Sequence, residues 1–195
     1  YRIYEESDYD TAVNSIVAQF ALPVIIKPND SGSTVGLTRV GEQSRVFDAL
    51  RQCATESPNV LVERYIAGRE MTVAVLDSQA LPVVEIRPKS GLYDYEAKYT
   101  KGKTEYITPA PIDDAVAEQM RVAAVELYDA IGAEGLARVD FILDDNNTAH
   151  CLELNTLPGM TELSLSPMAA KAAGISFEQL VDRIVTSAKE RHVRR

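Results

Sequence analysis

The pattern of the stretch ARVDFILDDNNTAHCLELN, residues 137–155, predicts two strands joined by a turn. This stretch limits the possible folds of the chain more than any other part of the sequence. Apolar and polar residues alternate before the turn, which is typical of a half-buried strand. Side chains two residues apart on a strand point to the same face. Arg138 and Asp140 therefore share a face, as do Glu153 and Asn155. If the two strands pair, three oxygen-bearing side chains converge beside one arginine.

These four side chains allow two interpretations. Asp, Glu and Asn oxygens are hard ligands that suit Mg²⁺. Alternatively, Arg138 forms a cross-strand ion pair with Asp140 or Glu153. Ion pairing leaves Asn155 without a role and does not require the turn at Gly159. We therefore favour a metal site.

The rest of the chain alternates predicted strands and helices. Strands are expected at 22–28, 59–66, 69–77, 80–87, 135–143 and 148–155, and helices at 10–20, 41–54, 113–131 and 176–190. Asp10 and Ser176 are the expected N-caps of the first and last helices. The mixture of hairpins and crossover helices predicts an α+β fold with two lobes, residues 1–68 and 69–195.

Composition limits the class of protein. The 195 residues are 46% hydrophobic and 25% charged, as in a soluble globular protein. The net charge of −9 argues against a nucleic-acid or anionic-membrane binder, and no stretch approaches the roughly 20 apolar residues of a membrane span. Cys53 and Cys151 are isolated, so we expect buried thiols in a cytoplasmic protein.

A second motif, VIIKPNDSGSTVG at residues 24–36, suggests a phosphate-binding loop. Lys27 ends a predicted strand, and Gly32 and Gly36 follow among hydroxyl side chains. Small residues let backbone N–H groups approach phosphate oxygens, and a lysine supplies a point charge. The loop is not a Walker A motif. A plain polar turn is the alternative.

A third motif, LVERYIAGRE at residues 61–70, carries Glu63 and Glu70. Either carboxylate has the chemistry to accept a hydrogen bond from an adenine amino group or a ribose hydroxyl. On this stretch alone, solvated charge at strand ends is the favoured interpretation.

The segment 88–108 has few aliphatic residues, four lysines and four tyrosines. A connection of about 20 residues is long for a compact domain and usually has a function. We expect it to be a lid that closes over the site and excludes water.

Four motifs together resemble the D-alanine–D-alanine ligases of the ATP-grasp superfamily: KPNDSGSTVG, YDYEAKY, ARVDFIL and LELNTLPGMTELS. They occur in order between about Leu22 and Leu180. The resemblance implies an ATP-grasp fold, in which two α+β lobes hold ATP. It also implies the ATP-dependent, ADP-forming joining of two D-alanines for peptidoglycan, and so for the cell wall and cell shape, by a cytoplasmic homodimer.

The resemblance also implies a role for each matching residue. For ATP these are Lys27 at the phosphates, Ser33 in the loop over them, Glu63 and the backbone of Arg64, Tyr65 and Ile66 at adenine, Glu70 at ribose and Lys98 at the γ-phosphate. For two Mg²⁺ ions, which Mn²⁺ could replace, they are Asp140, Glu153 and Asn155. For the amino acids and the oxyanion they are Ser33, Tyr99, Arg138, Gly159 and Ser164.

Three details of the resemblance affect the expected activity. Tyr99 stands where relatives that make D-alanyl-D-lactate often have His, so D-alanine is the expected second substrate. Leu163 stands where many relatives have His. The family's N-terminal domain, which contributes a Glu for the first D-alanine, does not precede Tyr1, so we expect these 195 residues alone to be inactive.

Two alternatives remain open. Another ATP-grasp carboxylate–amine ligase would share Lys27, Asp140, Glu153 and Asn155, but not the YEAKY and PGMT segments. A non-catalytic nucleotide-binding module is the third possibility, and the missing N-terminal domain is its best support.

Overall fold

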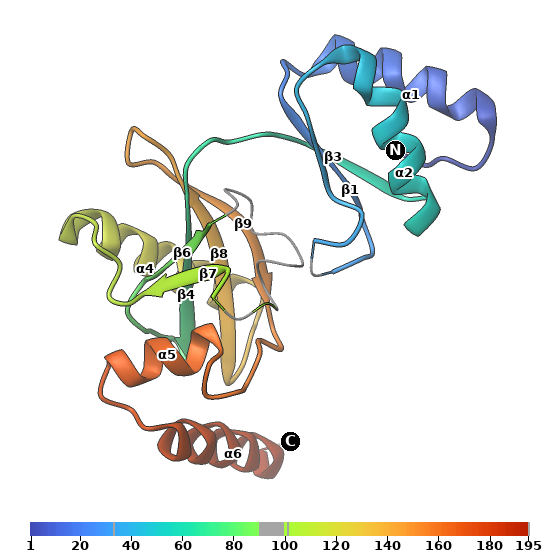
Figure 1. Cartoon of the computed structure of the whole chain (residues 1–195). Coiled ribbons are helices and arrows are strands. Elements are labelled where there is room, and N and C mark those ends of the chain that lie inside the picture. Colours follow the sequence, from blue (N-terminus) through green and yellow to red (C-terminus); the bar gives the residue numbers. More distant parts are fainter. Residues whose placement is uncertain (33, 90–99, 101, 195) are drawn as a thin grey trace. The chain divides into compact units, whose positions relative to one another are not determined.

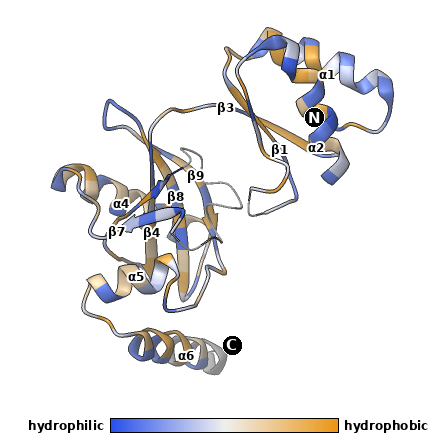
Figure 2. Ribbon diagram, viewed as in Figure 1, coloured by the Kyte–Doolittle hydropathy of each residue, from blue (hydrophilic) through white to orange (hydrophobic). Residues whose placement is uncertain are grey.

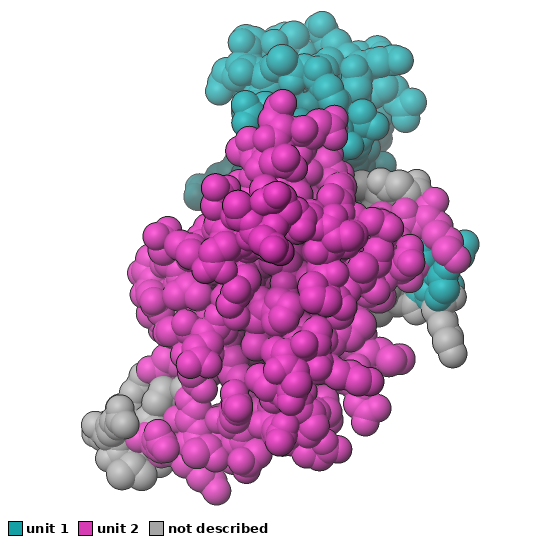
Figure 3. Space-filling model, turned by 90° about the vertical axis from the view of Figure 1, so that its left-hand side faces the viewer, with its two compact units in different colours: residues 1–66, 90–103 teal, residues 67–89, 104–195 magenta. Residues whose placement is uncertain are grey.

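The computed structural model describes residues 1–32, 34–89, 100 and 102–194, with the backbone alone for 191–194. The chain forms two compact units, coloured separately in Figure 3. Unit 1 comprises residues 1–66 and 90–103, and unit 2 comprises residues 67–89 and 104–195. Helices and antiparallel sheets occur in both, which confirms the α+β class. The expected domain boundary between residues 68 and 69 stays a prediction.

Unit 1 is a small antiparallel sheet with two helices beside it (Figure 1). Its elements are α1 (Glu6–Gln19), β1 (Val24–Pro28), β2 (Thr38–Val40), the 3₁₀ helix η1 (Gln43–Arg45), α2 (Val46–Glu56) and β3 (Val60–Arg64). The strand order is β2-β1-β3. Ile16 of α1, Leu50 of α2 and Ile26 of β1 are buried in one core. This core fixes β1 and β3, the strands that carry Lys27 and Glu63.

The start of α1 differs from the expected position. The helix begins at Glu6, ahead of Asp10, so the predicted N-cap was wrong. The carboxylate of Asp8 accepts hydrogen bonds from the backbone N–H groups of Tyr4 and Glu5, at 2.7 and 3.0 Å. This acidic side chain near the helix N-terminus satisfies backbone donors there and favours an earlier start.

Unit 2 is built on a larger antiparallel sheet. Its elements are β4 (Arg69–Leu76), β5 (Gln79–Ala80), β6 (Val84–Pro88), β7 (Thr104–Ile107), α4 (Asp114–Ala130), β8 (Leu136–Leu143), β9 (Ala149–Asn155), α5 (Leu165–Ala172) and α6 (Phe177–Arg194). The strand order is β7-β6-β4-β8-β9, and β5 pairs with β4.

One face of this sheet packs against α4. Met71 and Val73 of β4 and Phe141 of β8 are buried in one core with Met120 and Tyr128 of α4. The strands are accordingly mixed in hydropathy along their length (Figure 2). Because side chains alternate along a strand, the polar residues between these core positions lie on the opposite face.

Several elements of unit 2 were not predicted. Strand β7 lies within the expected loop 88–108 and pairs with β6, with Glu85 opposite Ile107 and Pro88 opposite Thr104. The expectation of a loop was therefore wrong for 104–107, where Thr, Tyr and Ile favour a strand.

Helix α5 was not predicted from the sequence. Ser176 accepts a hydrogen bond from the Gln179 N–H at 3.2 Å, as an N-cap does, and α6 runs on to Arg194. Residues 90–99 and 101 of the expected lid lie outside the described residues.

The two cysteines are free and differ in exposure. Cys53 is buried in the core of unit 1, and this burial raises the pKa of its thiol to about 11. Cys151 is exposed on β9, so the expectation of two buried thiols was wrong for this residue. None of the helices that the structure describes is both long and apolar enough to cross a membrane.

A buried carboxylate on β6 links this strand to β4, and its partner Arg69 reaches the segment before α4. Glu85 is 2% exposed and accepts from Arg69 Nε and Nη2 at 2.7 and 2.8 Å, and from Arg87 Nη2 at 2.8 Å. Arg69 also donates to the Pro111 carbonyl at 3.2 Å. Burial alone raises the pKa of Glu85, but the hydrogen bonds and charges of Arg69 and Arg87 outweigh it and hold that pKa below its ordinary value.

We predict that Glu85→Gln costs about 1–3 kcal/mol of unfolding free energy at pH 7, because it removes the charge of a buried carboxylate that accepts hydrogen bonds from two partly exposed guanidinium groups. A carboxylate with a depressed folded-state pKa stabilises the protein above its unfolded pKa, roughly 4.3, and loses this effect as the pH falls through the folded value. The loss caused by the substitution should therefore shrink below pH 4. Urea titrations at several pH values measure this. Glu118→Gln, in an exposed pair with Arg121, is the control. An equal loss at every pH would contradict the prediction.

Gly68 gives a steric prediction. A Cβ at this position would lie 2.6 Å from Ile142 Cγ2 and would overlap the Leu143 carbonyl oxygen. Gly68→Ala should therefore lower the unfolding free energy by roughly 1–3 kcal/mol through overpacking. Gly41→Ala is the control, since a Cβ there meets nothing within 4 Å. Equal denaturation midpoints for the two variants would show that the chain does not pass so close to β8.

Candidate active site

The predicted hairpin is present, as β8 and β9. Arg138 lies opposite Asn155 and Asp140 lies opposite Glu153. Val139 and Phe141, between and beside the polar residues of β8, are buried in the core against α4. All four polar side chains therefore share the face of the sheet that α4 does not cover.

A β-bulge sets the alignment of the two carboxylates. Phe141 pairs with Cys151, whereas Asp140 pairs with Glu153, so Leu152 is an extra residue in β9. In an unbroken register, Leu152 would stand opposite Asp140. The bulge thus moves Glu153 into the position across from Asp140.

The turn of the hairpin is closed by one aspartate. Asp144 Oδ1 accepts from the N–H groups of Asn146 and Thr148, both at 2.9 Å, and Oδ2 lies 3.0 Å from His150 Nε2. The hydrogen bond from His150 and those from the backbone hold the pKa of Asp144 below its ordinary value. This turn chemistry keeps the strands in register.

Arg138 forms a two-pronged ion pair with Asp140. Arg138 Nε donates to Asp140 Oδ1 and Nη2 donates to Oδ2, each at 2.8 Å, and both side chains are 18% exposed. The ion-pair interpretation of the sequence is thus correct for this pair, and it coexists with the clustering of oxygen ligands. Such bidentate pairs fix the carboxylate plane.

Thr72 of β4 is a further contact that sequence reasoning missed. It is 1% exposed, stands directly opposite Asp140, and its hydroxyl donates to Asp140 Oδ1 at 2.6 Å. No local pattern could identify it, because the pairing of β4 with β8 joins residues 68 positions apart. Glu70 lies on the same face of β4, half-buried.

The chemistry of the hairpin fits a hard cation. Asp140 and Glu153 offer carboxylate oxygens on paired positions, and Asn155 offers an amide oxygen. Asn155 Oδ1 accepts from the Leu157 N–H at 3.0 Å, which uses one of its two lone pairs. Within the described ranges, no three His, Cys, Asp or Glu residues cluster in a way that could hold a metal ion.

Gly159 and Ser164 are brought together by the loop after β9. A Cβ at Gly159 would lie 3.0 Å from Ser164 Oγ, so the small residue permits this approach. Ser164 Oγ also accepts from the Thr161 N–H at 3.1 Å and lies 2.9 Å from Thr161 Oγ1. Thr161 was not singled out from the sequence. Ser164 is the N-cap residue of α5, where backbone N–H groups favour a negatively charged group.

In unit 1, Lys27 and Glu63 form an ion pair. Lys27 Nζ lies 2.8 Å from Glu63 Oε2, and the side chains are 27% and 36% exposed. They come from the adjacent strands β1 and β3. The charge of Glu63 is thus partnered by a lysine, which differs from the solvated strand end favoured on that stretch alone.

The segments on either side of this pair are constrained by a glycine, a backbone hydrogen bond and a cation–π contact. Gly36 has φ +71°, and a Cβ there would lie 2.8 Å from Pro28 Cγ, so the loop after β1 needs glycine. After β3, the Tyr65 N–H donates to the Pro23 carbonyl at 3.1 Å. The Arg39 guanidinium lies 4.2 Å from the Tyr65 ring centroid. Arg64 is exposed, and Ile66 is half-buried.

Three predicted site residues, Ser33, Lys98 and Tyr99, lie outside the described residues. The roles predicted for all of the site residues stay predictions.

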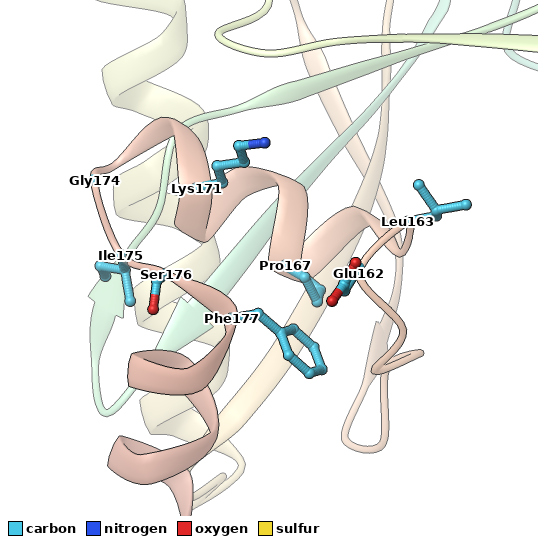
Figure 4. Close-up of a pocket in the computed structure, with 8 residues that line it drawn as sticks. All are labelled: Glu162, Leu163, Pro167, Lys171, Gly174, Ile175, Ser176 and Phe177. Atoms are coloured by element: carbon cyan, nitrogen blue, oxygen red, sulfur yellow. The ribbon is translucent and has the colours of Figure 1, made fainter.

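A hollow of about 480 Å³ in unit 2 lies elsewhere, between the loop before α5, α5 itself and the start of α6 (Figure 4). It is lined by Glu162, Leu163, Pro167, Lys171, Gly174, Ile175, Ser176 and Phe177. None of these is a predicted site residue. Leu163 is 81% exposed.

Comparison with known proteins identifies the family of the chain. Residues 3–186 match the family model described as D-ala D-ala ligase C-terminus. The chain is 46% identical over 169 residues to a D-alanine–D-alanine ligase of Syntrophotalea carbinolica, covering 87% of this chain and 55% of that protein. It is 42% identical over 186 residues to one of Magnetococcus marinus, covering 95% and 60%. The chain thus spans little more than half the length of these relatives.

Solved structures give the same result. The VanG D-Ala:D-Ser ligase from Enterococcus faecalis superposes with a TM-score of 0.83 at 32% identity, covering 95% of this chain and 55% of that one. The D-alanine–D-alanine ligase from Bacillus anthracis complexed with ATP gives 0.75 at 28% identity, covering 89% and 55%. The chain therefore has the ATP-grasp fold and belongs to the D-alanine–D-alanine ligase family, of which it matches the C-terminal part.

Proposed function

We propose that the protein is an ATP-dependent, ADP-forming ligase that joins two D-alanines for peptidoglycan precursor synthesis. The observation that carries this proposal is the polar face of the β8–β9 hairpin, where Asp140 stands opposite Glu153 and Arg138 opposite Asn155, in a chain that matches the ligase family.

The reaction has two chemical steps. A carboxylate oxygen of the first D-alanine attacks the γ-phosphorus of ATP, and ADP leaves with the electrons of the broken P–O bond. The amine of the second D-alanine, having lost a proton, attacks the acyl phosphate carbon. The attacking nitrogen then gives up a second proton to solvent, the tetrahedral oxyanion collapses, and phosphate leaves with the electrons of the broken C–O bond, so that the peptide bond remains. Both steps gather negative charge, so the protein's main contribution is positioned positive charge and N–H donors.

In unit 1, the proposed roles concern the nucleotide. Lys27 neutralises phosphate charge, and its ammonium has three protons, so the ion pair with Glu63 does not use all of its donor capacity. Glu63 accepts from the adenine amino group, and the backbone from Arg64 to Ile66 borders the base. Ser33, in the same loop as Gly36, donates to phosphate and to the first D-alanine.

In unit 2, the proposed roles concern the metal, the ribose and the amino acids. Asp140, Glu153 and Asn155 would hold two Mg²⁺ ions, or Mn²⁺. Bound Mg²⁺ offsets phosphate charge. Glu70 accepts from the ribose. Arg138 and the Gly159 N–H stabilise the oxyanion, and Ser164, at the N-terminus of α5, holds the carboxylate of the second substrate. Lys98 and Tyr99 are assigned to the γ-phosphate and the first D-alanine.

The second substrate and the setting of the reaction are parts of the same proposal. Tyr99 favours D-alanine as the second substrate. D-serine is the competing substrate, because the structurally similar VanG protein is a D-Ala:D-Ser ligase. We place the reaction in the cytoplasm and propose that the whole protein is a homodimer.

The test is an assay of the complete gene product that contains this sequence. With ATP, Mg²⁺ and D-alanine we expect D-alanyl-D-alanine and equal amounts of phosphate, and much less product with L-alanine or D-serine. D-alanine-independent ATP binding without product would favour a non-catalytic module, and product from another amine would favour a different ligase.

Within that assay, Glu153→Gln should lower kcat/KM by at least 100-fold, because it keeps the shape of the side chain and removes the charge that two cations would share. The fold should be unchanged by circular dichroism. Glu118→Gln, on the surface of α4, serves as the matched control and should retain full activity. Activity of Glu153→Gln within threefold of that control would refute the metal assignment.

A further inference from the structure

We propose that Thr72 is a positioning residue for the metal site: its buried hydroxyl engages one oxygen of Asp140 and leaves the other oxygen to the cation. The inference rests on the proposed function, because it takes Asp140 as a metal ligand. Thr72 lies on β4, which pairs with β6 on one side and β8 on the other. It is 1% exposed, so water does not compete for its hydroxyl.

The hydroxyl of Thr72 has one proton and two acceptors within reach. Asp140 Oδ1 lies at 2.6 Å and the Val139 carbonyl oxygen at 3.1 Å. A distance of 2.6 Å is typical of a hydroxyl that donates to an ionised carboxylate, which makes roughly twice as strong a bond as a neutral acceptor. The Thr72 hydroxyl therefore donates its hydrogen bond chiefly to Asp140 Oδ1, and the Val139 carbonyl is the weaker acceptor.

The lone pairs of the carboxylate then distinguish its two oxygens. Each oxygen accepts about two hydrogen bonds. Oδ1 receives Thr72 Oγ1 and Arg138 Nε, whereas Oδ2 receives Arg138 Nη2. From the residues that the structure describes, Oδ1 is saturated and Oδ2 retains one acceptor position.

The saturated oxygen is the one that β4 contacts, whereas the other proposed ligands lie on β9. Thr72 holds Oδ1 from β4, and Glu153 belongs to β9, on the other side of β8. Thr72 and Arg138 together thus convert a symmetric carboxylate into a ligand with one defined oxygen, without breaking the Arg138 pair. Groups that orient a metal ligand in this way typically change metal affinity by about 10- to 100-fold when they are removed.

If the Thr72 hydroxyl had a purely structural role, a different result would be expected. If the hydroxyl only satisfies buried polar atoms, its removal lowers stability and leaves metal affinity alone. Thr72→Val keeps the shape and removes the proton, whereas Thr72→Ser keeps the proton. The Val variant should bind Mn²⁺ about 10- to 100-fold more weakly, and the Ser variant should bind it nearly as well as the unsubstituted protein.

The experiment is a titration with Mn²⁺ in saturating ADP, with free Mn²⁺ followed by electron paramagnetic resonance. Thr38→Val, a half-buried strand threonine of unit 1, is the control for the same chemical change. ADP affinity without metal should be equal in all variants. If Thr72→Val does not fold, Thr72→Ala gives the same comparison with Thr72→Ser. Mn²⁺ affinity of the hydroxyl-free variant within twofold of Thr38→Val would overturn the proposal.

Asp140→Asn separates this inference from the proposed function. If Asp140→Asn loses Mn²⁺ affinity and Thr72→Val does not, the metal site stands and the role of Thr72 is wrong. If Asp140→Asn binds Mn²⁺ as tightly as the unsubstituted protein, or that protein binds none, the metal assignment fails and this inference fails with it.

Discussion

The pairing of β8 with β9, offset by one residue at Leu152, is the constraint on which the candidate site depends. Without the extra residue an apolar side chain would stand opposite Asp140, and Glu153 would move out of line. The register is strongly determined from the other face, because Val139 and Phe141 are buried against α4 and a slip of one residue would expose them. The Asp144 turn fixes the far end of the hairpin. Core packing and the turn thus position the polar side chains on the opposite face of the hairpin without contacting them.

This arrangement explains how an arginine and the proposed metal ligands can share one face of the sheet. The bidentate contact with Arg138 orients the Asp140 carboxylate, and the Thr72 hydroxyl holds it from the neighbouring strand. Unit 1 uses the same device on a smaller scale, where Lys27 and Glu63 pair across β1 and β3. In each unit, charged groups that the proposed reaction needs are partnered by opposite charges, which limits the cost of leaving them partly buried.

The sequence predicted what is local. Alternation along residues 137–155 predicted both strands, their turn and the face shared by Arg138, Asp140, Glu153 and Asn155, and the pairing confirmed it. Contacts between distant segments could not be predicted, because Thr72 reaches Asp140 only through the pairing of β4 with β8. The bulge at Leu152 shows in the sequence only as two adjacent apolar residues, Cys151 and Leu152, which do not by themselves identify a bulge. Strand β7 was missed because it lies in a polar segment and is recognised only by its pairing with β6. The cap expected at Asp10 was wrong because Asp8 accepts the backbone hydrogen bonds near the start of α1. The residue roles came from the family resemblance and are a separate kind of inference.

The most direct test of the account is a crystal structure of the protein grown with Mn²⁺ and ADP, with diffraction recorded where manganese scatters anomalously. The account predicts an anomalous peak about 2 Å from a carboxylate oxygen of Asp140, shared with Glu153 and Asn155, and an intact bond from Thr72 to the other Asp140 oxygen. Manganese bound elsewhere, with Asp140 still paired only to Arg138 and Thr72, would contradict it.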